Sequence, residues 1–174
     1  MPLRNALPET IESTRLLLRA PRASDLDELV AKANNWNVLE PTASLPFPYL
    51  EEHGRGFIER AVHKPDKRSY AIAERGNDRL MGVIGLYFHE TSPTELGYWL
   101  GEEHWGQGFA PEAVAALLAA CAGIGLSPVR ARVLAANKGS IRVLEKAGFV
   151  IVEKTRSIVE RHRGKPLLIA EWRR

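Results

Sequence analysis

The sequence predicts a mixed α/β domain built on a mostly antiparallel sheet. Runs with the alternation of strands and runs with the period of helices follow one another along the chain. Three strand-like runs are joined by short turns, which favours antiparallel neighbours. A helical run separates the third of them from the next strand, so these two are expected to be parallel neighbours joined by a crossover. The 174 residues, 45% of them hydrophobic, suit a single domain over residues 1–174.

The chain opens with a strand and a helix. "RLLLRAP" (Arg15–Pro21) has the pattern of a strand, and Ser24 with Asp27 predicts a capping box at the start of a helix. A proline-interrupted loop and a second amphipathic helix, Leu50–His63, come next. Loops of this length in compact domains are often functional.

The middle of the chain predicts three consecutive strands. The runs "SYAIAE" and "LMGVIGLYF" flank the hairpin signature "RGNDR", and "ELGYWLG" follows another short turn. A glycine-rich turn then leads into a helix, with Pro111 and Glu112 in its first turn and its apolar run ending at Gly123.

The last part predicts a strand, a short helix and a closing hairpin. "RARVLAA" is the strand, Asn137 caps the helix, and Gly148 is its expected left-handed terminator. The hairpin is expected from "FVIVEKTRSIVE" and "KPLLIAEW", with "ERHRGK" (160–165) as its solvated tip.

Composition excludes several classes of protein. No run approaches the roughly 18 apolar residues of a membrane span, and the N-terminus lacks the apolar core of a signal peptide, so we expect a cytoplasmic protein without membrane contact. A single cysteine, Cys121, excludes an internal disulfide and is expected to be a buried packing thiol. The net charge of +3 comes from scattered residues, so no direct binding of nucleic acid is expected. The five histidines show no ligand spacing, and no metal is predicted.

The segment "HWGQGFAPEAV" (104–114) predicts an anion site. Gly106 and Gly108 allow the backbone amides of residues 106–110 to point into one concavity at a helix N-terminus, where phosphate oxygens bind well. Two nucleotide motifs fail here, because the turn contains no lysine followed by a serine or threonine, and Pro111 stands where a dinucleotide fingerprint needs its third glycine. Taken alone, a Gly-x-Gly turn is weak evidence.

The order of these elements adds to that evidence. "ELGYWLGEEHWGQGFAPEAV", followed by a strand and "NKGSIRVLEKAGF", resembles the acetyl-coenzyme A binding core of the GNAT superfamily of N-acetyltransferases. The family's turn, Gln/Arg-x-x-Gly-x-Gly/Ala, fits residues 105–110 except at its first position. The Trp-Gly-x-Gly-x-Ala form resembles the RimJ/RimL branch, and the likeness extends from about Thr10 to Trp172.

The resemblance implies a twisted sheet of about seven strands with a central parallel splayed pair, flanked by about four helices. Acetyl-coenzyme A would be the cosubstrate, with its pantetheine arm in the wedge between the splayed strands. Leu100 would offer its backbone to the arm, and Asn137 would contact it from the other side while also capping its helix. The expected pyrophosphate cradle is Trp105, Gly106, Gln107, Gly108, Phe109 and Ala110.

The chemistry implied is attack of a neutral amine on a thioester, which needs a base and stabilisation of the departing thiolate. Glu95 is the expected base, because it opens the strand before the turn where many relatives place a glutamate. The general-acid tyrosine of many relatives is replaced by Leu144, so Ser140 is the expected substitute. Tyr98 is a weaker candidate, since alternation places it on the face opposite Glu95.

The acceptor site is expected between the loop Trp36–Tyr49 and the closing hairpin. The branch resemblance favours the N-terminal amine of a protein, such as a ribosomal protein, as acceptor. A small-molecule amine or an antibiotic stays open, as does a noncatalytic acyl-coenzyme A binding module, and use of acyl groups other than acetyl is undecided. The resemblance is also compatible with a homodimer.

Overall fold

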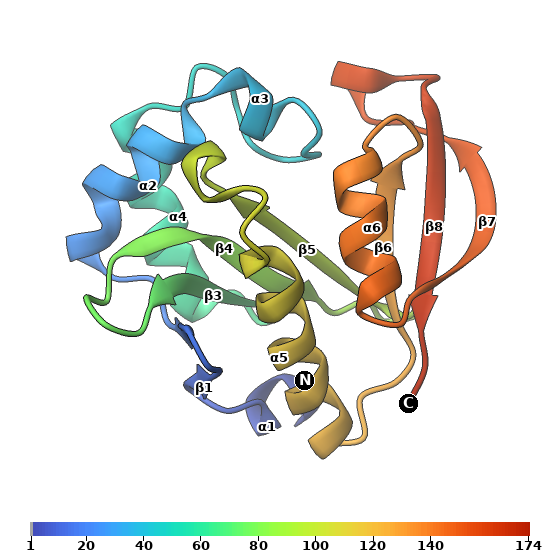
Figure 1. Cartoon of the computed structure of the whole chain (residues 1–174), viewed down its shortest axis with the longest axis horizontal. Coiled ribbons are helices and arrows are strands. Elements are labelled where there is room, and N and C mark those ends of the chain that lie inside the picture. Colours follow the sequence, from blue (N-terminus) through green and yellow to red (C-terminus); the bar gives the residue numbers. More distant parts are fainter. Residues whose placement is uncertain (1) are drawn as a thin grey trace.

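An eight-stranded sheet with the order β1-β2-β3-β4-β5-β6-β8-β7 forms the centre of the molecule (Figure 1). The computed structural model describes residues 2–174. The strands are β1 (Ile11–Glu12), β2 (Leu16–Arg19), β3 (Lys67–Glu74), β4 (Leu80–Tyr87), β5 (Thr94–Leu100), β6 (Val129–Leu134), β7 (Val150–Arg156) and β8 (Pro166–Trp172). The helices are α1 (Pro2–Ala6), α2 (Leu26–Ala33), α3 (Trp36–Leu39), α4 (Glu51–His63), α5 (Phe109–Gly123) and α6 (Lys138–Lys146), with 3-10 turns η1 (Ala23–Asp25), η2 (Glu102–His104) and η3 (Glu160–His162). The predicted fold class is confirmed, and the strand beyond the expected seven is the two-residue β1.

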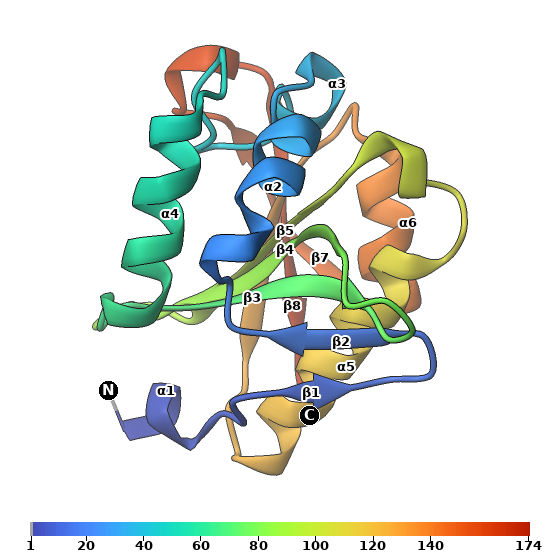
Figure 2. The ribbon, with the colours of Figure 1, turned by 90° about the vertical axis from the view of Figure 1, so that its left-hand side faces the viewer.

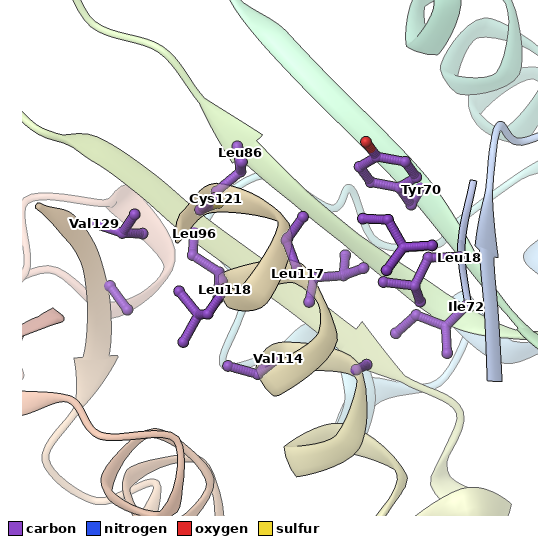
Figure 3. Close-up of a cluster of buried hydrophobic side chains, with 14 of the residues drawn as sticks. Leu18, Tyr70, Ile72, Leu86, Leu96, Val114, Leu117, Leu118, Cys121 and Val129 are labelled. Carbon is purple, nitrogen blue, oxygen red and sulfur yellow. The ribbon is translucent and has the colours of Figure 1, made fainter. Parts of the chain in front are cut away.

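Helices cover both faces of the sheet. In Figure 2, α2 and α4 lie on one side of β3, β4 and β5, and α5 and α6 lie on the other. Figure 3 shows Val114, Leu117 and Cys121 of α5 among buried side chains from the strands. Cys121 is fully buried, which raises the pKa of its thiol to about 12 and confirms its packing role. Within residues 2–174, none of the helices combines the length and the apolar character that crossing a bilayer requires.

The sheet is splayed between β5 and β6. These two strands are parallel, as predicted, and they pair at Thr94 with Val129 and at Glu95 with Arg130. They then diverge, because β5 follows its antiparallel partner β4 while β6 follows β8. A wedge therefore opens in the centre of the sheet, beyond Glu95.

Backbone groups of β5 face this wedge. The amide of Gly101 donates to the carbonyl of Met81 on β4, at 2.8 Å. Because hydrogen-bonding directions alternate along an antiparallel strand, the backbone groups of Tyr98 and Leu100 point away from β4. The wedge thus has polar backbone groups along one of its walls.

The start of α2 differs from the prediction. Ser24 does not cap the helix; the chain enters α2 through the 3-10 turn η1, and the carboxylate of Asp25 accepts the backbone amide of Arg22 at 2.9 Å. Asp25 is buried and also receives two bonds of 2.8 Å from the guanidinium of Arg19. The hydrogen bonds that Arg19 donates to Asp25 and to Asp78 raise the pKa of its guanidinium. An ion pair, which has no local sequence signature, therefore fixes this helix start.

The ends of α6 agree with the prediction. The side chain of Asn137 accepts the amide of Ser140 at 3.2 Å, and Gly148 adopts a φ of 94°, in the left-handed region that favours glycine. Phe149 is buried against the same core. These two caps fix where α6 stands beside the wedge.

We predict that Asp25→Ala lowers the free energy of unfolding by about 3 kcal/mol, because it leaves the buried Arg19 without its main partner. Urea unfolding monitored by circular dichroism measures the change. Arg22→Ala is the matched control, since Arg22 pairs with Asp78 at the exposed surface, and we expect it to lose less than about 1 kcal/mol. Equal losses in the two variants would contradict the assigned role of the buried pair.

Candidate active site

A continuous cavity of about 1870 Å³ occupies the wedge and extends to both faces of the sheet. Tyr98 and Ser140 line it on the α5 and α6 side, and Trp99 and Tyr49 line it on the α2 and α4 side. A single small ligand usually occupies about 300–1,000 Å³. The volume is therefore sufficient for two substrates that meet in the wedge.

The glycine turn has the geometry expected of an anion site. Gly106 and Gly108 adopt φ angles of 72° and 80°, and α5 begins immediately afterwards at Phe109. The first N–H groups of a helix have no partner within the helix, and the helix dipole makes this end positive. The amides at Phe109 and Ala110 therefore face the mouth of the cavity with partial positive charge.

Arg15 braces this turn from the start of β2. Its guanidinium donates to the carbonyl of Gln107 at 3.0 Å, bonds Glu112 at 2.7 Å and lies 4.1 Å from the centroid of the Phe109 ring. Glu112 also accepts the hydroxyl of Ser13 at 2.7 Å. Although burial favours the neutral acid, these hydrogen bonds hold the pKa of Glu112 below its usual value. The sequence did not predict either partner, because they lie more than ninety residues from the turn.

Two further contacts fix the segment before the helix. The indole of Trp105 donates to the carbonyl of Leu100 at 2.8 Å, and the side-chain amide of Gln107 donates to the carbonyl of Glu103 at 3.0 Å. Both backbone groups of Leu100 point away from β4. Its carbonyl already has the Trp105 indole as a partner, so its N–H is the group left for a ligand in the wedge. The side chains of Trp105 and Gln107 thus stabilise the conformation of the turn through hydrogen bonds to the preceding residues.

The two faces of β5 carry different chemical groups. The hydroxyls of Tyr98 and Ser140 form a hydrogen bond of 2.7 Å on the α5 side. Burial raises the pKa of Tyr98 to about 12, so its hydroxyl is protonated at neutral pH. Leu144, at the position expected for a tyrosine, is buried in the core instead. As predicted, the side chain of Tyr98 lies on the face of β5 that is opposite to the face of Glu95. It forms a hydrogen-bonded pair with Ser140.

Glu95 lies on the α4 side of the same strand. One of its carboxylate oxygens accepts the guanidinium of Arg132 at 2.8 Å. The other is 3.7 Å from Nε2 of His89. Arg132 therefore orients the carboxylate, and the second oxygen faces the ring of His89. Across residues 2–174, no group of three or more acidic, histidine or cysteine side chains is gathered that could hold a metal ion.

This arrangement agrees with the comparison to protein families. A family model described as an acetyltransferase (GNAT) domain matches residues 15–150. The chain belongs to this family. It is accordingly an acetyl-coenzyme A dependent N-acetyltransferase. The uncharacterized N-acetyltransferase p20 of Bacillus licheniformis is 29% identical over 147 residues, which are 81% of this chain and 82% of that protein.

Solved structures share the fold of the acetyltransferase. Mycobacterium smegmatis RimJ in complex with CoA-disulfide gives a TM-score of 0.82 at 19% identity, covering 97% of this chain and 88% of that one. RimL, a ribosomal alpha-N-protein acetyltransferase in complex with coenzyme A, gives 0.79 at 22% identity, covering 95% and 98%. The spermidine N-acetyltransferase from Vibrio cholerae in complex with CoA and spermine gives 0.76 at 20% identity, covering 92% and 96%.

A contact between distant segments joins the β7–β8 hairpin to the region around α3, and residues of both line the cavity. Arg161, at the tip of the β7–β8 hairpin, donates to the carbonyls of Leu39 at 2.8 Å, of Thr42 at 3.2 Å and of Leu45, all in or after α3. Figure 1 shows α3 and this hairpin tip at the same end of the molecule. The expectation of a solvated tip therefore holds for Glu160 and for residues 163–165, which are exposed, and is wrong for Arg161 and His162, because Arg161 clamps the hairpin against the α3–α4 loop.

The hairpin tip also brings a histidine into the lining of the cavity. His162 is 4% exposed, and its Nδ1 is hydrogen-bonded to the hydroxyl of Ser157 at 2.6 Å. Its Nε2 has no partner among residues 2–174. Neither residue was predicted, since only the docking of the hairpin brings them to the cavity.

The aromatic residues of the α3–α4 loop divide into two groups. Tyr49 is buried in the core under α2 and α4. Trp36 and Phe47 are about half exposed and pack edge to face with their centroids 5.2 Å apart. Tyr49 therefore has a packing role, whereas Trp36 lines the cavity and forms an exposed apolar pair with Phe47.

We predict that Gly108→Glu weakens binding of coenzyme A more than tenfold, because the carboxylate repels the phosphates and the side chain enters the turn. Isothermal titration calorimetry measures the affinity. Gly125→Glu is the control, since Gly125 has a similar φ of 72° at the other end of α5 with open space around it. Both variants pay a backbone strain of about 1–2 kcal/mol, so equal affinities in the two would exclude the turn as the phosphate site.

Proposed function

We propose that this acetyltransferase transfers the acetyl group of acetyl-coenzyme A to the N-terminal amine of a protein, as a RimJ/RimL-like enzyme, by direct attack of the amine on the thioester. The observation that carries the proposal is the distribution of groups on β5. Glu95 lies on one face, and the Tyr98–Ser140 pair lies on the other. A thioester held in the wedge would have a base on the side of the amine and hydrogen-bond donors on the side of the thiolate.

In this proposal the coenzyme enters from the α5 side. Its pyrophosphate would bind the turn of residues 105–110, where the amides at Phe109 and Ala110 supply donors. The pantetheine amides would pair with the N–H of Leu100, in place of the strand that the splay removes. The carbonyl of the Asn137 side chain caps α6, so its amide nitrogen is the part that would contact the arm.

The departing thiolate is stabilised by hydrogen bonds in this mechanism, without full proton transfer. A thiol titrates near 8.5, so a tyrosine with a pKa of about 12 would give up its proton at a cost of about 5 kcal/mol. Tyr98 can instead donate to Ser140, which in turn donates to sulfur. A chain of two hydroxyls polarises both bonds and places the terminal donor at the thioester.

Glu95 acts on the other side as the base that receives the proton of the acceptor ammonium. Arg132 occupies one carboxylate oxygen, so the proton passes to the oxygen that faces His89, directly or through a water molecule. The amine must be neutral before it attacks. A carboxylate held by Arg132 keeps its orientation during this step.

The form of the acceptor site supports a polypeptide amine. The exposed Trp36 and Phe47, and Ile158 at 83% exposure on the hairpin, give the surroundings of the mouth apolar surface that a peptide can cover. RimL, among the structures of this fold, is an alpha-N-protein acetyltransferase. A small amine is the second candidate, because a spermidine N-acetyltransferase shares the fold as well.

A substrate comparison tests this assignment. Free thiol release and mass spectrometry would be followed with three acceptors: a peptide with a free N-terminus, the same peptide with a blocked N-terminus and an internal lysine, and spermidine. We expect acetylation of the first only, at its α-amine. Preference for spermidine would replace the proposed acceptor by a small amine, and tight coenzyme binding without any acetylation would favour a binding module.

We predict that Glu95→Gln lowers turnover at neutral pH by about 10²-fold, because the amide keeps the size of the side chain and loses its basicity. The deficit should shrink as the pH rises towards the acceptor's own pKa, about 8 for an α-amine, because more of the amine is then neutral. A pH–rate profile of parent and variant with one acceptor measures this. A constant deficit at every pH would contradict general-base catalysis by Glu95.

We predict that Tyr98→Phe and Ser140→Ala each lower turnover about tenfold, since each breaks the hydroxyl chain to the thiolate. The affinity for coenzyme A should change much less. The double variant should be little worse than either single variant, because the two hydroxyls act as one unit. Multiplicative effects in single-turnover kinetics would show that the two hydroxyls act independently.

A further inference from the structure

The floor of the acceptor side is built from residues in register across three strands. Lys67 of β3 lies opposite Tyr87 of β4, which lies opposite Glu95 of β5. The ammonium of Lys67 donates to the hydroxyl of Tyr87 at 2.8 Å and lies 4.3 Å from the centroid of its ring. The ammonium of Lys67 therefore lies over β4, the middle strand. Neighbouring strands are about 5 Å apart, so it is about that far from β5, the strand that carries Glu95.

The next row of the floor has almost no side chains. Ser69 lies opposite Gly85, which lies opposite Gly97. The hydroxyl of Ser69 is 3% exposed, lines the cavity and has no hydrogen-bond partner among residues 2–174. A Cβ at Gly97 would meet the Tyr87 ring at 3.5 Å, an ordinary contact, so packing does not require glycine here. The two glycines leave an open slot beside Glu95 with a free hydrogen-bonding group at its end.

The charges around this slot are unbalanced. Arg60 and Lys64 at the end of α4 line the same cavity as Lys67. Among the described residues, none of the three makes an ion pair with a carboxylate. Of the carboxylates that line this part of the cavity, Glu95 is already paired with Arg132. Asp66 is the other one, so three cations face one free carboxylate.

We infer that the acceptor carries a carboxylate close to its reactive amine, so that the preferred N-terminus has an acidic side chain at its second or third residue. The inference rests on the proposed function and names the substrate class of the same site. Three unpaired cations in a cleft attract an anionic group and repel a polycation such as a polyamine. The hydroxyl of Ser69 is available for a backbone group of the peptide.

The distances across the floor fit this length of chain. With the amine in the slot beside Glu95, consecutive Cα atoms are about 3.8 Å apart, so a carboxylate on the second residue lies about 6–7 Å from the amine. That span reaches the ammonium of Lys67 over the middle strand. A carboxylate on the third residue lies about 10 Å away and reaches towards Arg60 on α4 and Lys64 directly after it.

A peptide series tests the inference. The acceptors are Ser-Asp-Ala-Ala, Ser-Asn-Ala-Ala and Ser-Lys-Ala-Ala, with Ser-Ala-Asp-Ala to probe the third position, and kcat/KM is measured for each. We expect the Asp peptide to exceed its isosteric Asn partner about tenfold, as a charge-assisted hydrogen bond would give, and the Lys peptide to be the poorest. Lys67→Met should reduce the Asp-to-Asn ratio to within about threefold.

Two controls separate this effect from structural damage. Lys154→Met removes the same charge from the exposed strand β7, outside the cavity lining, and should keep the Asp preference. Arg60→Gln, at an exposed helix position, should lower kcat/KM for Ser-Ala-Asp-Ala without Lys67 being touched. Equal kcat/KM for Asp, Asn and Lys peptides in the parent would overturn the inference, as would a second-position Asp preference that survives in Lys67→Met.

A different result would contradict the proposed function without deciding the inferred carboxylate. If small amines are acetylated and none of the peptides is, the N-terminal acceptor is wrong, and the charge preference is read from free aspartate against asparagine. A higher kcat/KM for aspartate would uphold the inferred carboxylate, and equal values would overturn it.

Discussion

The divergence of β5 from β6 after two paired residues is the constraint on which the site depends. A strand that leaves its neighbour exposes backbone N–H and C=O groups, and such groups need new partners when they are buried. The carbonyl of Leu100 is satisfied by the indole of Trp105, and the remaining groups face a cavity that accepts a ligand. The same divergence gives β5 two accessible faces, so that one strand carries both Glu95 and Tyr98.

Contacts on both sides anchor the elements that border this wedge. On one side, Arg15 and Ser13 bind Glu112 and anchor the start of α5, and hence the glycine turn, to β2. On the other side, α6 is held between the Asn137 cap and Gly148. The hairpin of β7 and β8 is clamped to the α3–α4 loop by Arg161, and residues of both segments line the cavity.

Much of this architecture could be predicted from the sequence, because its signals are local. Alternation located the strands, the intervening helix indicated the parallel pair, and Gly108 and Asn137 marked helix starts through their own backbone and capping chemistry. Contacts between distant residues could not be predicted in the same way. Tyr98 and Ser140 are 42 residues apart, and Arg161 lies 122 residues from Leu39, so their pairing depends on the completed sheet. The solvated tip was expected because a charged hairpin usually faces water, and here the carbonyls of Leu39, Thr42 and Leu45 supplied partners for Arg161.

Hydrogen exchange of individual amides, measured by NMR with and without coenzyme A, tests the central claim most directly. The N–H groups of Tyr98 and Leu100 face the wedge, whereas those of Gly97 and Trp99 face β4. If the ligand replaces the missing strand, coenzyme A should slow exchange at Leu100 and at the amides of Phe109 and Ala110, with much smaller changes at Gly97 and Trp99. Unchanged exchange at Leu100 in the saturated protein would show that the coenzyme does not occupy the wedge and would contradict the account.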